Sequence, residues 1–258
     1  MLLLKLLLVP GLVAAVTLAV RRWGPAVGGW LAGLPVVAGP VLVFYALEQG
    51  DAFAAQAAQA TLAGLIATSA FAVVYARCSV RLPWYGCVVL GWTAFAATIL
   101  VLYALQPSLV PSLVSLVAAT VLGRRVLSHH GPAEAGPYVH QGVGDLPIRL
   151  VAAATLVLVL TGLAERLGAT LSGLLNAFPV LTTIIAAFTH AQRGRAAAVA
   201  FLNGYLQSVV GFGLFCVVMA LTLVPFGLTR AVLAALLGQS VVPAWMLWRL
   251  RRNPERTR

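Results

Sequence analysis

Acidic residues are the scarcest class in this chain, with 6 of them among 258 residues against 17 lysines and arginines. Charged residues together make up 9%, whereas a soluble domain carries roughly 25%. This deficit excludes an ordinary soluble fold, and hydrophobic residues instead reach 61%. The composition predicts an all-α polytopic membrane protein, because helices satisfy their own backbone polar groups in lipid.

The long apolar runs contain no aspartate or glutamate, since every acidic residue lies between or beyond those runs. This distribution disfavours proton coupling through a carboxylate buried in the membrane, although backbone carbonyls with threonine or asparagine remain able to bind sodium. The runs also lack paired carboxylates and a nucleophile with a neighbouring base. We therefore expect a protein that is not an enzyme and has no catalytic residues.

Cysteine is rare as well. Cys78, Cys87 and Cys216 are odd in number, lie in or beside apolar runs and form no CxxC pair, which is typical of small core residues. The histidine-containing segment 128–147 matches no zinc-site spacing, and its glycines and prolines are typical of a linker. We expect neither a metal nor another cofactor.

Polar residues divide the chain into nine apolar runs, each long enough to cross a hydrocarbon core about 30 Å thick. The first run has no small-x-small cleavage site, so we expect a retained helix rather than a cleaved signal peptide. The predicted transmembrane helices are Leu3–Val20, Gly24–Leu47, Ala52–Ala76, Trp84–Leu105, Leu109–Leu127, Ile148–Ala164, Gly168–His190, Ala196–Leu223 and Leu228–Trp248.

Basic residues concentrate in alternate segments between these runs, and 14 of the 17 follow this pattern. Because lysine and arginine accumulate in cytoplasmic loops, the pattern predicts a periplasmic N-terminus and a cytoplasmic C-terminus. The compact sequence rich in alanine and arginine favours a bacterial inner membrane. The net charge of +11 then reflects orientation and attraction to anionic lipid rather than nucleic-acid binding. The alternating residues are Arg21, Arg22, Arg77, Arg81, Arg124, Arg125, Arg149, Arg193, Arg195 and the tail after Trp248.

One motif containing glycine and proline occurs twice. GPAVGGWLAGLPVV at 24–37 parallels GATLSGLLNAFPVL at 168–181, so that Gly29 matches Gly173 and Pro35 matches Pro179. The offset of 144 residues extends without gaps over residues 12–76. Identities spread over such a length indicate internal duplication.

With this offset of 144 residues, the first four runs align with the last four, and the fifth run connects the two copies. Because five runs separate equivalent elements, the two copies enter the membrane from opposite sides, as in many secondary transporters. We therefore expect inverted four-helix repeats at 1–106 and 146–258, the second with a basic tail, joined by a connecting helix and loop at 107–145.

Each copy places a proline near the middle of its second run, which predicts that helices 2 and 7 are broken or kinked. Gly33 and Asn176 are residue types that accept a left-handed helix cap, and a following proline suits the first position of a new half-helix. Two half-helix N-termini at mid-membrane favour an anion. Close helix packing is the alternative explanation for the glycines.

The second copy is more polar around its proline, and the third and eighth runs carry amides at equivalent positions. Amides within spans face the protein interior, where they either hydrogen-bond between helices or line a route. The candidate substrate-binding residues are Gly33, Pro35, Ala38, Gly39, Gln59, Asn176, Pro179, Thr182, Thr183 and Asn203.

These features predict a small secondary transporter or facilitator that moves a small anionic or zwitterionic metabolite by alternating access at a midplane site. One alternative is a translocase for a lipid or lipid-linked head group, because the pocket would be largely apolar. Another is a non-transporting scaffold in which the prolines only kink their helices. The expected partners are the small-molecule substrate and membrane lipids, without nucleic acid, and a homo-oligomer is compatible with the sequence.

Overall fold

The computed structural model describes residues 2–128, 145–164 and 168–252, with side chains at 10–127, 147–156 and 168–240. The described residues form helices and contain no strand, as the composition predicts. The helices are α1 (Leu2–Trp23), α2 (Pro25–Ala32), α3 (Ala38–Gln49), α4 (Asp51–Cys78), α5 (Trp84–Leu105), α6 (Leu109–Ser128), α7 (Asp145–Ala164), α8 (Ala169–Asn176), α9 (Val180–Phe226) and α10 (Leu228–Arg252).

Every predicted apolar run forms helix in the structure, and two of the runs contain a break. The second run contains both α2 and α3, and the seventh contains α8 and the beginning of α9. Helix α9 also contains the eighth run, and the two runs are separated at Gly194, whose φ of 78° and ψ of 177° interrupt the helix. The predicted runs therefore coincide with helices.

Four helical stretches in the described residues are long and apolar enough to cross a membrane. They are Asp51–Cys78, Trp84–Leu105, Leu109–Leu127 and Ala169–Phe226.

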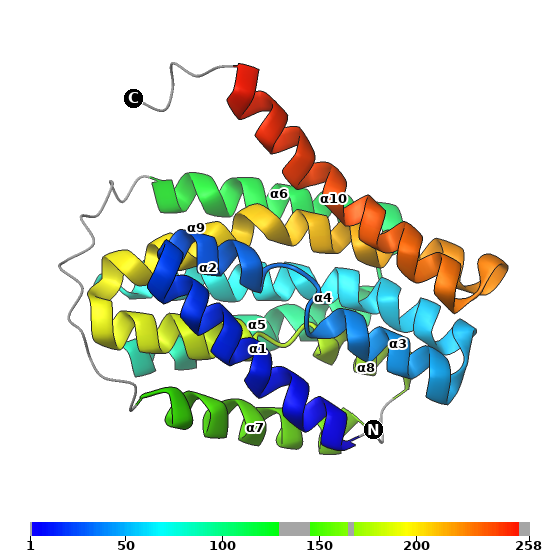
Figure 1. Cartoon of the computed structure of the whole chain (residues 1–258), viewed down its shortest axis with the longest axis horizontal. Coiled ribbons are helices and arrows are strands. Elements are labelled where there is room, and N and C mark those ends of the chain that lie inside the picture. Colours follow the sequence, from blue (N-terminus) through cyan, green and yellow to red (C-terminus); the bar gives the residue numbers. More distant parts are fainter. Residues whose placement is uncertain (1, 129–144, 165–167, 253–258) are drawn as a thin grey trace.

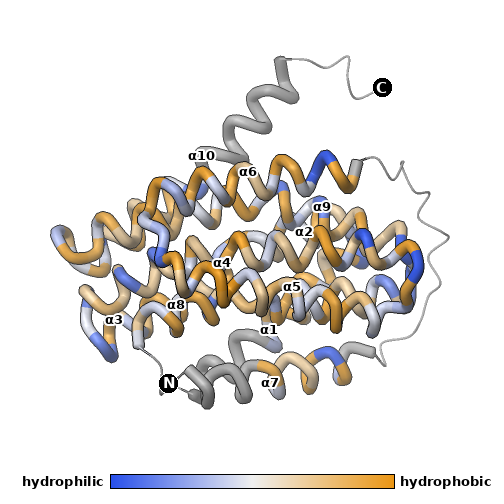
Figure 2. Tube along the Cα trace, turned by 180° about the vertical axis from the view of Figure 1, so that it is seen from behind, coloured by the Kyte–Doolittle hydropathy of each residue, from blue (hydrophilic) through white to orange (hydrophobic). Residues whose placement is uncertain are grey.

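Most helices run along the long axis of the molecule (Figure 1). The turn between α3 and α4 lies at one end, and the interruption of α9 at Gly194 lies at the opposite end (Figure 1). Apolar positions cover most of the helices, whereas hydrophilic positions gather largely at these two ends (Figure 2). An apolar middle between polar ends is the distribution that a bilayer requires.

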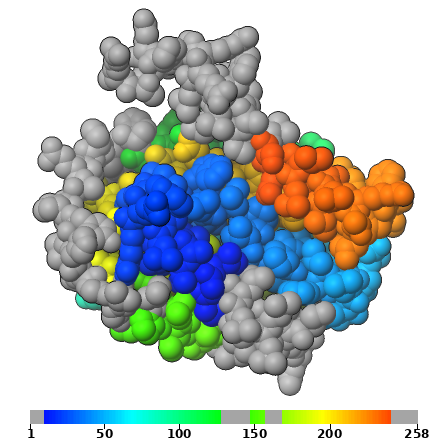
Figure 3. Space-filling view, viewed as in Figure 1, coloured from blue at the N-terminus to red at the C-terminus, as the bar shows by residue number. Residues whose placement is uncertain are grey.

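Helix α4 lies at the centre of the fold and packs against α3, α5, α6, α8 and α9. In an apolar 18-residue stretch of α4, 72% is buried inside the protein, against 22% in the corresponding stretches of α5 and α6. Large apolar side chains on α6 and α10 remain exposed, including Val110 at 72% and Leu237 at 73%. On one face α1, α2, α3 and α10 form the outer layer (Figure 3). The outer helices therefore present the apolar surface suited to lipid.

The helix boundaries repeat with the same offset of 144 residues as the sequence motif. Helix α2 spans residues 25–32 and α8 spans residues 169–176. Gly50 ends α3 with a φ of 90°, and the equivalent Gly194 interrupts α9 with a φ of 78°. Glycine suits both positions because positive φ is strained for side chains with a Cβ. The two copies therefore have similar helix boundaries, although the N-caps differ, since Gly24 has a φ of 90° and Gly168 a φ of −66°.

Candidate functional site at two helix breaks

The first break comprises residues 33–37, between α2 and α3. The backbone N–H of Gly33 donates to the carbonyls of Gly29 at 3.1 Å and Trp30 at 3.3 Å, and Leu34 donates to Leu31 at 3.2 Å. The N–H of Gly39 donates to Pro35 O at 2.8 Å as the next helix begins. The chain is therefore fully interrupted and not merely kinked.

The second break comprises residues 177–179, between α8 and α9. Ala177 donates to Leu174 O at 3.3 Å and Phe178 donates to Leu175 O at 2.9 Å. Thr183 donates to Pro179 O at 2.8 Å. Each of these three bonds has its counterpart in the first break 144 positions earlier. The second break also has a bond from Val180 N to Phe178 O at 2.8 Å that the first break lacks, so the two patterns agree only in part.

The predicted left-handed caps are wrong. Gly33 has a φ of −86°, and Asn176 is the last residue of α8 rather than a residue with positive φ. Both half-helices instead end in a tight turn with bonds between residues three apart, which pairs the last N–H groups without a left-handed residue. The prolines also precede the first helical position, since Pro179 is the N-cap of α9 and Pro35 lies within the turn.

The glycines of the breaking helices instead allow close helix crossing, which is the alternative explanation derived from the sequence. A Cβ at Gly29 on α2 would overlap the carbonyl of Phe201 on α9. A Cβ at Gly173 on α8 would overlap the carbonyl of Ala57 on α4. Gly29 and Gly173 are equivalent, and so are Ala57 and Phe201. The two crossings are therefore reciprocal between the copies.

A second reciprocal pair follows one turn further along. A Cβ at Gly33 would overlap Ser208 Oγ and lie 2.8 Å from Tyr205 O. At the equivalent crossing, a Cβ at Gly64 would lie 2.7 Å from Ala177 Cβ. One member of each pair is glycine, so each crossing accommodates a single small side chain.

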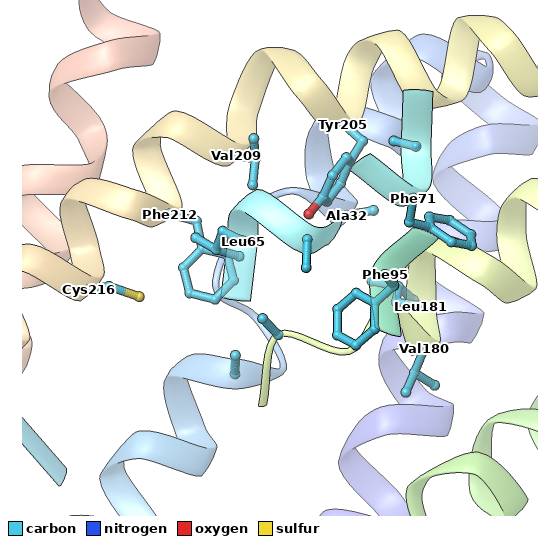
Figure 4. Close-up of a cluster of buried hydrophobic side chains, with 14 of the residues drawn as sticks. Ala32, Leu65, Phe71, Phe95, Val180, Leu181, Tyr205, Val209, Phe212 and Cys216 are labelled. Atoms are coloured by element: carbon cyan, nitrogen blue, oxygen red, sulfur yellow. The ribbon is translucent and has the colours of Figure 1, made fainter. Parts of the chain in front are cut away.

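A side-chain hydrogen bond joins the two breaks. Asn176 Nδ2 lies 3.3 Å from the carbonyl oxygen of Ala38 at the start of α3, and 3.3 Å from Thr61 Oγ1 on α4. Leu65, Phe95 and Tyr205 belong to the cluster of buried apolar side chains in the core (Figure 4). Residues 138 positions apart in sequence therefore meet at a partly buried contact.

Two threonines of α4 satisfy carbonyls at the end of α8. The Thr61 hydroxyl lies between Ala57 O of its own helix at 2.8 Å and Gly173 O at 3.0 Å, and Thr68 donates to Ala177 O at 2.5 Å. Unpaired carbonyls in an apolar interior are costly, so these bonds stabilise the break. Sequence reasoning missed Thr68, whose spacing of seven residues from Thr61 places both hydroxyls on one helix face.

Aromatic side chains of α5 pack against the second break. Trp92 Nε1 donates to Thr183 Oγ1 at 3.1 Å, and the Trp92 and Phe178 rings are 5.6 Å apart. The Phe95 and Phe178 rings are 5.2 Å apart in an edge-to-face arrangement. Nothing in the motif itself identified these α5 residues, because they come from a different helix.

The breaks contain or adjoin eight of the predicted binding residues. Seven of these residues are buried and Asn176 is partly buried. Gln59 and Asn203 have their partners elsewhere, since Gln59 Nε2 lies 3.5 Å from Pro107 O and Arg124 Nε lies 3.4 Å from Asn203 Oδ1. The eight residues are Gly33, Pro35, Ala38, Gly39, Asn176, Pro179, Thr182 and Thr183.

The described residues contain no group of three histidine, cysteine, aspartate or glutamate side chains able to hold a metal ion. Residues 129–144 of the histidine-containing segment lie outside the described residues. The chain matches no protein-family model, no curated protein and no solved structure.

Proposed function

We propose that this protein is a small secondary transporter or facilitator that binds its solute between the two helix breaks and exposes the solute alternately to each side of the membrane. The observation that carries the proposal is the meeting of two equivalent breaks, joined by the Asn176–Ala38 hydrogen bond. Interrupted backbone at membrane depth is tolerated where it is buried in protein or lines a cavity. Paired discontinuous helices are a recurring substrate site in carriers.

The reciprocal crossings support an inverted arrangement of two repeats. Position 29 contacts position 201, and the equivalent position 173 contacts position 57, the equivalent of 201. Such exchange of partners between two copies is the property of a two-fold axis. Equivalent helices are five runs apart, an odd step that reverses their direction through the membrane and makes that axis lie in the membrane plane. We propose inverted repeats at 1–106 and 146–258 with a periplasmic N-terminus.

The chemistry of the breaks suits a small anionic or zwitterionic solute. The N-termini of α3 and α9 begin at the breaks and carry partial positive charge. The C-termini of α2 and α8 end there and carry the opposite partial charge. The hydroxyls of Thr182 and Thr183 on α9 add hydrogen-bonding groups that the first copy lacks.

Thiol accessibility tests this proposal without knowledge of the solute. In a background without Cys78, Cys87 and Cys216, single cysteines at the equivalent positions Ala38 and Thr182 are treated with a membrane-impermeant maleimide from each face. We expect labelling from both faces at both positions, because an alternating site opens to each side in turn. Candidate solutes should then change the labelling rates.

Control positions establish what protection and orientation look like. Ala186 lies one turn beyond Thr182 and is fully buried, so Ala186→Cys should stay unlabelled. Glu48→Cys should react only from the periplasm and Ala191→Cys only from the cytoplasm, since both positions are exposed. Glu48 belongs to the last turn of α3 and Ala191 precedes the interruption of α9, and these two segments lie at opposite ends (Figure 1). Protection of Ala38→Cys and Thr182→Cys from both faces under all conditions would refute the transporter.

Movement of a lipid or lipid-linked head group is the second candidate. The aromatic contacts of Trp92 and Phe95 with Phe178 favour it, because they give the second break an apolar wall. Reconstituted vesicles containing a fluorescent lipid test this function. Loss of head-group fluorescence from the protected leaflet, beyond that of protein-free vesicles, would favour the lipid translocase.

A further inference from the structure

A buried amide oxygen on α10 has no hydrogen-bond partner. Gln239 is partly buried as a residue, and its Oε1 atom is buried without a donor within the described residues. Buried polar atoms in proteins are nearly always hydrogen-bonded, because an unpaired one keeps the full cost of leaving water. An amide oxygen of this kind is therefore expected to find its donor in a bound molecule.

Gln239 lies beside the part of α9 that supports the first break. A Cβ at Gly211 on α9 would lie 3.1 Å from Gln239 O, so α9 and α10 are in close contact here. One turn earlier on α9, Ser208 Oγ occupies the place that a Cβ at Gly33 would need. Helix α10 packs against α9 and also contacts α3, which follows the first break. The same part of α9 thus contacts Gln239 on α10 and the beginning of the first break.

The internal repeat gives a second reason to place Gln239 at the first break. Helix α10 begins at Leu228, which is 144 residues after Trp84 at the start of α5. Gln239 is therefore the equivalent of Phe95. The Phe95 ring packs edge-to-face on Phe178 in the second break, with the ring centres 5.2 Å apart. The second break has an apolar side chain where the first has a hydrogen-bond acceptor.

The chemistry of an amide oxygen restricts what can pair with it. This oxygen accepts hydrogen bonds and cannot donate one. A carboxylate also only accepts, so a solute with anionic groups alone cannot satisfy Gln239 Oε1. A primary ammonium group has three N–H donors and no acceptor, and it therefore complements the oxygen.

We propose that Gln239 Oε1 accepts a hydrogen bond from the primary ammonium group of a zwitterionic substrate. This inference rests on the proposed transport function and narrows its substrate from anions and zwitterions to zwitterions. The apolar part of the substrate packs on the wall formed by Phe95 and Phe178. The ammonium group belongs either to a free amino acid with an apolar side chain or to the ethanolamine head group of a lipid.

Competition against thiol labelling tests the assignment. The parent is Ala38→Cys in the background without native cysteines, reconstituted in phosphatidylglycerol vesicles, which contain no lipid amine. Leucine and isocaproate have the same carbon skeleton and carboxylate, and they differ only in the α-amine. Leucine should slow maleimide labelling at about tenfold lower concentration than isocaproate, which is the effect of one hydrogen bond from a charged donor.

Variants at position 239 then identify the acceptor. Gln239→Leu removes the oxygen and should make leucine and isocaproate equally weak. Gln239→Glu keeps an acceptor and should retain the preference for leucine. Ser240→Ala is the matched control, because Ser240 is exposed and its hydroxyl donates to Leu236 O of its own helix. This control should behave as the parent does.

Stability separates a binding role from a structural one. Gln239→Leu should unfold at the parent Tm or above it, because the substitution removes a buried atom that has no partner. A lower Tm would show that the oxygen is paired within the protein and would overturn the inference. A preference for leucine that survives in Gln239→Leu would overturn it as well.

The two sources of the ammonium group are distinguished by the vesicles. If leucine has no effect, labelling is repeated with phosphatidylethanolamine in the bilayer. Slower labelling of the parent but not of Gln239→Leu assigns the group to a lipid. Unchanged labelling, with access still alternating, overturns the ammonium site but leaves the transporter intact. A parent labelled from neither face overturns the transporter and the site with it.

Discussion

Replacing Gly29 or Gly173 by alanine should destabilise the protein at its two closest helix crossings. At Gly173 the new Cβ would lie 2.6 Å from Ala60 Cβ and 2.9 Å from Ala57 Cα, besides overlapping Ala57 O. Carbon atoms pack without repulsion at about 3.5–4.0 Å. The neighbouring helix must therefore move by about 1 Å to accept the methyl group. Gly29 faces the same situation against the backbone of Phe201.

The cost follows from two opposing terms. Overpacking of this kind costs about 1–3 kcal/mol, and the better helix propensity of alanine returns up to about 1 kcal/mol. The net destabilisation is about 1–2 kcal/mol. For a chain of this size that corresponds to a fall in Tm of about 2–8 °C. Because the crossings are reciprocal, Gly29→Ala and Gly173→Ala should lower Tm by similar amounts.

Thermal unfolding in detergent, followed by tryptophan fluorescence, measures the effect. Gly11→Ala is the matched control, because Gly11 lies inside a helix and a Cβ there meets no atom within 4 Å. Its Tm should stay unchanged or rise slightly, since only helix propensity is altered. If Gly29→Ala and Gly173→Ala unfold at the temperature of Gly11→Ala, the close-crossing argument is incorrect.

Two further predictions concern buried groups. Thr68→Val should lower the free energy of unfolding by about 1 kcal/mol, because Ala177 O loses its hydroxyl donor. Thr93→Val, on an exposed face, should change Tm little. Equal effects of the two substitutions in the same unfolding assay would contradict this prediction. In the folded protein a maleimide should react much faster with Cys78, which is partly exposed, than with the fully buried Cys87 and Cys216. Mass spectrometry measures these rates. Equal rates before denaturation would show that the described packing around the cysteines is wrong.

Much of the local structure follows from the order of residues. The nine apolar runs coincide with helices, because burial of apolar side chains and backbone pairing act over one run at a time. The prolines also predicted where two helices are interrupted, since proline removes a backbone donor wherever it occurs. Inverted topology, orientation and transport stay predictions, because they concern the chain in a membrane and not its helices alone.

The details of the breaks were harder to predict. Gly33 suggested a left-handed cap, but its lack of a side chain serves contact with α9 instead. A sequence shows that a position is small without showing whether backbone conformation or a neighbouring helix demands it. Similarly, Gln59 aligned with Asn203 in the repeat, yet the two amides bond to Pro107 and Arg124 rather than at the breaks.

By itself, the sequence determined the helical class, the approximate extent of the helices and the positions of the two interruptions, because composition and proline act locally along the chain. Only the tertiary structure decided which segments meet. The bond from Asn176 to Ala38 and the crossing of Gly29 with Phe201 join residues far apart in the chain. Such contacts depend on how closely two helices approach, and that distance is set by all the side chains between them.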